Sequence, residues 1–209
     1  MARMIQRRKI HRFTLDGSGT EYPVRFKEDI LAAEEPLEIR LGGRSFAVTT
    51  RTPGDDFDLV AGFLVSEGVI RSASELVSLR FCAGGPDEEQ TFNVVDAQLR
   101  PDVPLPDTMR HVYTSSSCGI CGTESIEAVR KTLHFDPSRD GLRVPVDVVA
   151  GLPERLREAQ AVFDKTGGVH AAGLFRVDRG EPELLCLRED VGRHNAVDKV
   201  VGWALRQGM

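Results

Sequence analysis

Residues 37–50, LEIRLGGRSFAVTT, constrain the fold of this chain more tightly than any other stretch. Aliphatic and polar residues alternate on both sides of Gly42-Gly43, and alternation with a period of two is typical of a half-buried β-strand. A two-residue Gly-Gly loop closes a tight hairpin, because glycine adopts the positive φ that such turns require. We therefore predict two adjacent antiparallel strands joined at this turn.

A helix is predicted directly after the hairpin. Pro53-Gly54 indicates a turn, and Asp55 or Asp56 can accept hydrogen bonds from the free N–H groups of a helix start. Apolar residues then recur at helical spacing as far as Gly68, a typical helix end.

The chain is predicted to divide near residue 107. Short strands are expected at 76–81 and 91–95, and residues 100–107 then hold three of the eleven prolines. We predict a small α+β N-terminal part over residues 1–107 and a layered α/β domain over residues 108–209.

The second half alternates predicted helices with apolar strands. The expected elements are a helix at 124–133, a helix at 152–168, strands at 169–177 and 183–187, and a helix at 195–206. The last helix is predicted to face the core with Val197, Val200, Val201 and Leu205.

Composition excludes several functional classes. The 209 residues include 27 Lys and Arg against 32 Asp and Glu, and a net charge of −5 argues against a general nucleic-acid binder. No apolar stretch approaches the ~20 residues that span a bilayer, so no membrane association is expected. The basic N-terminus lacks the apolar core of a secretion signal, so we predict a cytoplasmic protein whose four cysteines are reduced.

Cys118 and Cys121 form a C-x-x-C pair within SSSCGICG, and four interpretations compete for it. Structural zinc normally needs four ligands, and no matching second pair is present in the sequence. A thioredoxin-like redox pair usually follows a strand directly, whereas this pair follows a polar run. A pair of inert core cysteines fits poorly among so many serines and glycines. Cys186, a separate cysteine, is predicted to be buried in a strand.

The fourth interpretation is a nucleophilic sulfur that carries cargo as a persulfide. Glycines beside the cysteines let the backbone approach closely, and the start of a following helix would favour the thiolate. Glu124 opposes this effect, since a nearby carboxylate disfavours a thiolate. From the residues alone, the sulfur carrier and the redox pair remain close.

A second cluster of chemical groups lies in residues 187–205, LREDVGRHNAVDKVVGWAL, where a strand leads into a helix. A helix N-terminus with Arg193, His194 and Lys199 would suit a phosphate or pyrophosphate. A capped helix start with surface ion pairs is the alternative. His170, in TGGVHAAG, is expected to be a hydrogen-bonded core histidine.

Four segments together resemble the FdhD family, the accessory sulfurtransferases of formate dehydrogenase. They are EEPLEIRLGGRSFAVTTRTPGDDFDLVAGFLVSEGVI, SSSCGICG, TGGVHAAGLF and EDVGRHNAVDK, and they span roughly residues 34–205. The resemblance implies a cytidine-deaminase-like α/β domain without the zinc chemistry. It also implies a persulfide carrier that takes sulfur from a cysteine desulfurase and passes it to the molybdenum cofactor, a bis-guanine-dinucleotide form.

The resemblance implies that Cys118 carries the persulfide and that Cys121 assists it. No permanently bound cofactor or metal is expected. The implied partners are the cysteine desulfurase, the molybdenum cofactor as acceptor and formate dehydrogenase, and a homodimer, the commonest oligomer, is left open. Family members usually continue for several dozen residues past the RHNAVDK helix, so the C-terminal domain is expected to be incomplete. Two alternatives stay open: a redox or zinc module using the same cysteines, and a non-catalytic chaperone that delivers cofactor.

Overall fold

The computed structural model describes residues 3–14, 24–83, 89–105, 112–113, 139–177 and 181–209. Its elements over these residues are β1 (Ile5–Phe13), β2 (Val24–Ala32), β3 (Glu35–Leu41), β4 (Arg44–Arg51), α1 (Asp56–Ser66), a 3-10 turn (Ala73–Glu75), β5 (Leu76–Phe81), β6 (Val94–Leu99), β7 (Val112–Tyr113), α3 (Val146–Glu158), α4 (Ala161–Thr166), β8 (His170–Arg176), β9 (Glu183–Asp190) and α5 (Arg193–Arg206). The class is a mixed α/β fold, as predicted.

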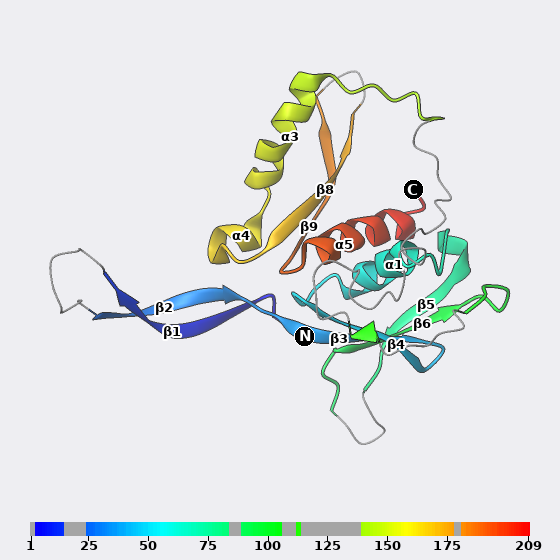
Figure 1. Ribbon diagram of the computed structural model, residues 1–209, viewed down its shortest axis with the longest axis horizontal. Helices are drawn as coiled ribbons and strands as arrows, with labels where there is room; N and C mark the ends of the chain where they lie inside the picture. Colours follow the sequence, from blue (N-terminus) through cyan, green and yellow to red (C-terminus); the bar gives the residue numbers. More distant parts are fainter. Residues whose placement is uncertain (1–2, 15–23, 84–88, 106–111, 114–138, 178–180) are drawn as a thin grey trace.

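A five-stranded mixed sheet in the order β5-β6-β3-β4-β7 forms the base of the structure (Figure 1). β3 and β4 make the predicted hairpin, and both turn glycines have positive φ, 56° at Gly42 and 80° at Gly43. β3 also pairs with β6 in parallel, so the hairpin lies in the middle of the sheet. The predicted hairpin is therefore confirmed, and the structure adds that it lies at the centre of the sheet.

The main apolar core lies between this sheet and α1. Its buried residues are Leu37, Ile39, Leu41, Leu59, Val60, Leu64, Val69, Ile70, Val95, Ala97 and Val103. All of them lie in the first half of the chain, which is long enough to form a core of its own.

α5 covers the other side of α1, and two glycines set the distance between the helices (Figure 1). A Cβ added at Gly62 would lie 1.8 Å from the carbonyl oxygen of Asp198, and one added at Gly202 would lie 1.8 Å from that of Asp58. Each glycine therefore lets its helix approach the backbone of the other. This contact joins residues on either side of the predicted boundary at residue 107, and the division into two domains stays a prediction.

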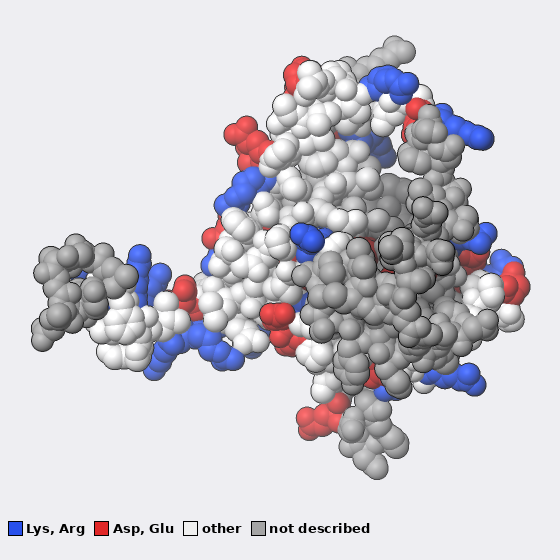
Figure 2. Space-filling view, in the orientation of Figure 1, with Lys and Arg blue, Asp and Glu red and all other residues white. Residues whose placement is uncertain are grey.

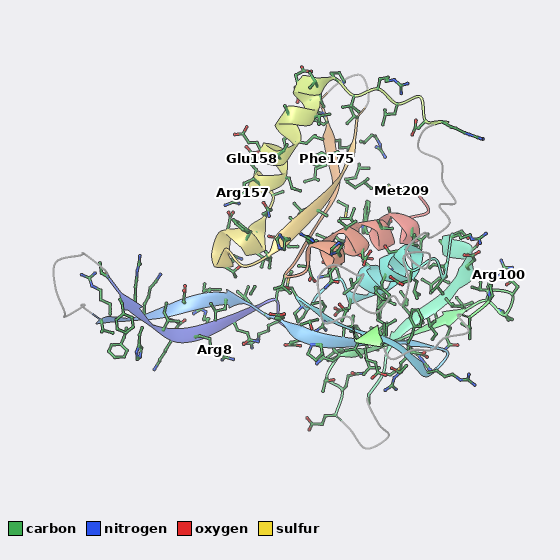
Figure 3. The ribbon with its side chains drawn as sticks, in the orientation of Figure 1. Arg8, Arg100, Arg157, Glu158, Phe175 and Met209 are labelled. Carbon is green, nitrogen blue, oxygen red and sulfur yellow. The ribbon has the colours of Figure 1, made fainter. Side chains whose placement is uncertain are left out.

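The β8–β9 pair with α3 and α4 forms a smaller unit, with α3 lying against β8. Side chains fill the space between α3 and these strands, Phe175 among them (Figure 3). The deaminase-like layering of this half stays a prediction, and the predicted helix at 124–133 lies outside the described residues.

Several sequence predictions are wrong in detail. The predicted helix at 152–168 is two helices, α3 and α4, because the chain breaks at Ala159 and Gln160. The predicted strand at 91–95 lies further on, as β6. Of the predicted core face of α5, Val200 is buried and Leu205 packs against the main core, but Val197 is 51% exposed. His170 is exposed at the start of β8.

Asp96 of β6 holds the hairpin turn in place. Its carboxylate accepts hydrogen bonds from the Gly43 N–H at 2.7 Å, from Gln98 Nε2 at 2.7 Å and from Arg80 Nη2 at 3.0 Å. Burial opposes the charge, but these hydrogen bonds outweigh burial and hold the pKa of Asp96 below its usual value.

We expect Asp96→Asn to lower the free energy of unfolding by about 2 kcal/mol near neutral pH. A lowered folded-state pKa gives stability that is present above the unfolded pKa of about 3.9 and is lost as pH falls through the folded value. The difference between variant and parent should therefore shrink below about pH 4 in urea unfolding. Glu28→Gln, at an exposed ion pair with Arg7, is the control, and a difference independent of pH would contradict the assignment.

Candidate functional site

The first turn of α5 carries two of the predicted site residues on the surface. Arg193 is the first residue of the helix and His194 the second, and both are exposed. Cys118 and Cys121 lie outside the described residues. The structure therefore describes the second cluster of chemical groups, in residues 187–205, but not the cysteine pair.

Lys199 is on the same helix, but the structure does not bring its ammonium group to the surface. Its side chain is fully buried and forms an ion pair with Asp190 at 2.8 Å. The ammonium also donates to the carbonyl oxygens of Thr52, at 2.8 Å, and Glu189, at 3.3 Å. With its three protons directed at these acceptors, Lys199 joins the β4–α1 loop to the end of β9.

Asp190 is the centre of this network. One carboxylate oxygen faces Lys199 and accepts from the backbone N–H of Thr52 at 3.1 Å. The other accepts from the backbone N–H of Gly192 at 2.8 Å and from Asn195 Nδ2 at 3.0 Å. This buried carboxylate lies at the N-terminus of α5, where the helix dipole favours negative charge. An external anion at this helix start would therefore depend mainly on the side chains of Arg193 and His194.

Two further contacts fix the same loop. The Thr52 hydroxyl accepts from the backbone N–H of Val191 at 3.1 Å, and Asn195 Nδ2 donates to the carbonyl oxygen of Thr50 at 2.8 Å. Hydrogen bonds between residues 138 or more positions apart in the sequence thus hold the segments RTPGDD and EDVGRHN together.

A second buried ion pair supports the start of α1. Arg51 is fully buried, and its Nε lies 2.8 Å from Asp56 Oδ1. The same guanidinium donates to the carbonyl oxygens of Glu35, Pro36 and Phe92. Asp56 therefore pairs with Arg51 and does not cap the helix, and Asp55 at the N-cap position forms no side-chain cap. The predicted carboxylate cap is wrong.

Asp58 joins α1 to the C-terminal elements. Arg188 of β9 donates to it at 2.8 Å, and Arg206 at the end of α5 forms a second ion pair at 2.5 Å. Next to Arg188 on β9, Cys186 is 5% exposed, as predicted. Burial raises the pKa of the Cys186 thiol, and the nearby Arg188 only partly opposes this. A thiol in this position is held protonated and is unsuited to nucleophilic attack.

Glu189 has a role that the sequence did not reveal. Its two carboxylate oxygens accept from the backbone N–H groups of Val162 and Phe163, both at 2.8 Å, and so satisfy the start of α4. The network at the end of β9 therefore also positions the smaller unit. The only sequence signal for it is the density of charged residues in LREDVGRHN.

A pocket of about 480 Å³ opens near the other end of α5. Its lining residues are Met4, Gly54, Asp55, Asp56, Phe57, Asp58, Phe81, Phe92 and Arg206. The carboxylates of Asp56 and Asp58 in this lining are buried and already form ion pairs with Arg51, Arg188 and Arg206. Arg193 and Arg206 stand at opposite ends of the helix, roughly 20 Å apart along its axis, so the pocket and the exposed pair are separate places.

The described residues contain no group of three or more potential metal ligands. Within the same ranges, no helix is both long enough and apolar enough to cross a membrane.

Comparison with known proteins assigns a family. A sequence model described as the FdhD/NarQ family matches residues 32–209. A protein of Streptomyces avermitilis is 53% identical over 212 residues, which cover 100% of this chain and 72% of the relative. A protein of Nocardia farcinica is 50% identical over 206 residues, covering 98% and 70%. Both are named sulfur carrier protein FdhD.

A solved structure from Desulfotalea psychrophila shares the fold. It is described as a candidate formate dehydrogenase accessory protein, and it superposes with a TM-score of 0.69 at 23% identity. The superposition covers 99% of this chain and 71% of that one.

Proposed function

We propose, since this chain belongs to the FdhD/NarQ family, that it is a sulfur carrier in the maturation of formate dehydrogenase. It accepts sulfur from a cysteine desulfurase as a persulfide and transfers it to the molybdenum cofactor in its bis-guanine-dinucleotide form. The observation that carries this proposal is 53% identity to a sulfur carrier protein FdhD across all of this chain. Such a sulfurtransferase works in the cytoplasm, where thiols are kept reduced.

Cys118 is the proposed carrier. Its thiolate attacks the outer sulfur of the desulfurase persulfide, so that one S–S bond forms as another breaks and the desulfurase thiolate leaves. This exchange needs no oxidant, because the sulfur moves between two thiolates at one oxidation level. The serines and glycines of SSSCGICG support an accessible thiol at this position.

Cys121 is proposed to release the cargo. Attack of its thiolate on the Cys118 sulfur forms a Cys118–Cys121 disulfide and expels the outer sulfur as sulfide. The two cysteines supply the two electrons that reduce the sulfur, and a dithiol reductant must then restore both thiols. The sulfide is the form that can become a ligand of the cofactor metal.

The cofactor contacts are proposed on α5. Arg193 and His194, exposed on its first turn, would bind phosphate groups of the acceptor. Lys199 is included in this site as a positioning residue, because its buried ion pair with Asp190 fixes the helix start on which the other two stand.

Sulfur loading on Cys118 is the central prediction. After incubation with a cysteine desulfurase and cysteine, intact mass should show the gain of one sulfur atom, and Cys118→Ala should lose it. Cys121→Ala should still load but should fail to release sulfide. Cys82→Ala is the matched control, because Cys82 is a free and partly exposed cysteine and should leave loading unchanged.

Other results would point to the alternatives. Loading that persists in Cys118→Ala would sink the proposal. A stoichiometric metal that protects both thiols of the pair would favour a zinc module, and a disulfide without sulfur gain would favour a redox module. Restoration of formate dehydrogenase activity by Cys118→Ala in cells that lack the native factor would favour a delivery chaperone.

A further inference from the structure

β1 and β2 form a two-stranded ribbon that extends away from the rest of the structure (Figure 1). Nine consecutive residue pairs join the two strands without a bulge. The family model begins at residue 32, so nearly all of the ribbon precedes the matched region. The ribbon is attached at its base, where Ala33 donates to the Met4 carbonyl at 2.8 Å.

The strand register sorts the side chains of the ribbon onto two faces, because residues directly opposite each other share a face. At the far end of the described ribbon, one face carries Arg12 opposite Arg25 and then Lys27 opposite Ile10. We call Arg12, Arg25 and Lys27 the cationic strip. All three are exposed, and they form no ion pair with any described residue.

The opposite face is apolar at the same end. Phe13 pairs with Val24, and His11 pairs with Phe26 at a ring distance of 4.6 Å. We call Phe13, Val24 and Phe26 the aromatic strip, and they are 57%, 44% and 78% exposed. Figure 2 shows blue basic side chains gathered along the ribbon with uncharged ones between them, and Figure 3 shows ribbon side chains, such as Arg8, lying clear of the rest of the structure.

The cationic strip does not stabilise the ribbon, and the exposed aromatic strip stabilises it only through its cross-strand pairs. Like charges directly opposite each other destabilise a β-ladder, and a lone two-stranded ribbon is marginal without packing on its faces. Apolar side chains that stay exposed to water contribute no hydrophobic stabilisation to the fold. The arrangement therefore suits a surface that a partner covers.

The edges of the ribbon determine what form the partner takes. Over the described residues β1 and β2 pair only with each other, so each strand offers one outer edge of backbone N–H and C=O groups. An extended segment can add to such an edge, and its side chains then alternate between the two faces. Acidic side chains on one face would meet the cationic strip, and apolar ones on the other would meet the aromatic strip.

We propose that the far end of this ribbon binds an extended segment of a protein partner in which acidic and apolar residues alternate. The rest of the chain favours a polypeptide over nucleic acid or an anionic membrane. Residues 33–209 hold 20 Lys and Arg against 28 Asp and Glu, so an extended polyanion would be repelled outside the ribbon. This inference does not depend on the chemistry of Cys118.

The test uses the full chain and a labelled peptide of alternating glutamate and valine, about as long as the nine-residue strands. Fluorescence anisotropy should show binding that weakens with added salt. Arg12→Gln combined with Arg25→Gln should weaken it by at least about tenfold. Phe26→Ser should weaken binding without changing its salt dependence.

Matched controls separate the ribbon from general charge. Arg143→Gln combined with Lys165→Gln removes two exposed cations elsewhere and should change binding less than about twofold. A peptide of the same composition, with its glutamates gathered in one half, should bind more weakly. Circular dichroism should show the same fold in every variant.

Any of four results would overturn the proposal. They are no binding of the alternating peptide, equal weakening by both double variants, tighter binding to anionic phospholipid vesicles or a single-stranded oligonucleotide, and loss of self-association in the ribbon variant during sedimentation. The last would assign the ribbon to a second copy of this chain.

Discussion

Replacing Lys199 with methionine should lower the free energy of unfolding by about 3–5 kcal/mol. The side chains of Lys199 and Asp190 are both fully buried and lie 2.8 Å apart. Removing the ammonium leaves the Asp190 carboxylate buried without its counter-charge, and it leaves the carbonyl oxygens of Thr52 and Glu189 without this donor. Urea unfolding followed by circular dichroism measures the loss.

A second substitution identifies the cause. Adding Asp190→Asn to the Lys199→Met variant removes the unpaired charge, so the double variant should be more stable than Lys199→Met alone. Arg193→Gln, on the exposed side of the same helix, should change stability by less than about 0.5 kcal/mol. If the double variant instead loses more free energy of unfolding than Lys199→Met alone, the buried unpaired charge is not the cause of the loss.

Gly202→Ala should destabilise the protein by about 3 kcal/mol. The added Cβ would lie 1.8 Å from the carbonyl oxygen of Asp58, and backbone cannot rotate away as a side chain can. α1 and α5 would have to separate, which strains the ion pairs of Asp58 with Arg188 and Arg206. Thermal unfolding should detect the change.

Gly151→Ala is the matched control for this substitution. Gly151 lies within α3 and nothing would contact its added Cβ, so this alanine should stabilise the protein by about 0.5–1 kcal/mol through helix propensity. Gly62→Ala should repeat the loss seen at Gly202, because its Cβ would meet Asp198 in the same crossing. Similar behaviour of Gly151→Ala and Gly202→Ala would contradict the close approach.

Sequence patterns correctly predicted the helices and strands that are determined by residues close together in the chain. The β3–β4 hairpin was found because alternation and the Gly42-Gly43 turn lie within fourteen residues. α1, β5, β8, β9 and α5 were also located by periodicity. The core face of α5 was predicted only in part. Val200 is buried as expected, but Val197 is exposed, because the close crossing with α1 is made at Asp198 and Gly202.

The candidate site shows the same limit. The charge density around Arg193 drew attention to the right segment, but the sequence could not separate surface cations from buried ones. Lys199 is buried by partners up to 147 residues away, and no periodicity reports such a pairing. The roles of Cys118 and Cys121 stay predictions, as do the cofactor contacts.

The crossing of α1 and α5 also governs how the chain reaches its fold. Hydrogen bonds from Arg188 and Arg206 to Asp58 join residues 130 and 148 positions apart. At about 5–20 residues per second, a ribosome needs roughly 7–30 s to add the covering helix after α1 has been made. Throughout that interval the side of α1 that carries Asp58 and Gly62 faces water, so this crossing can form only after α5 has left the ribosome.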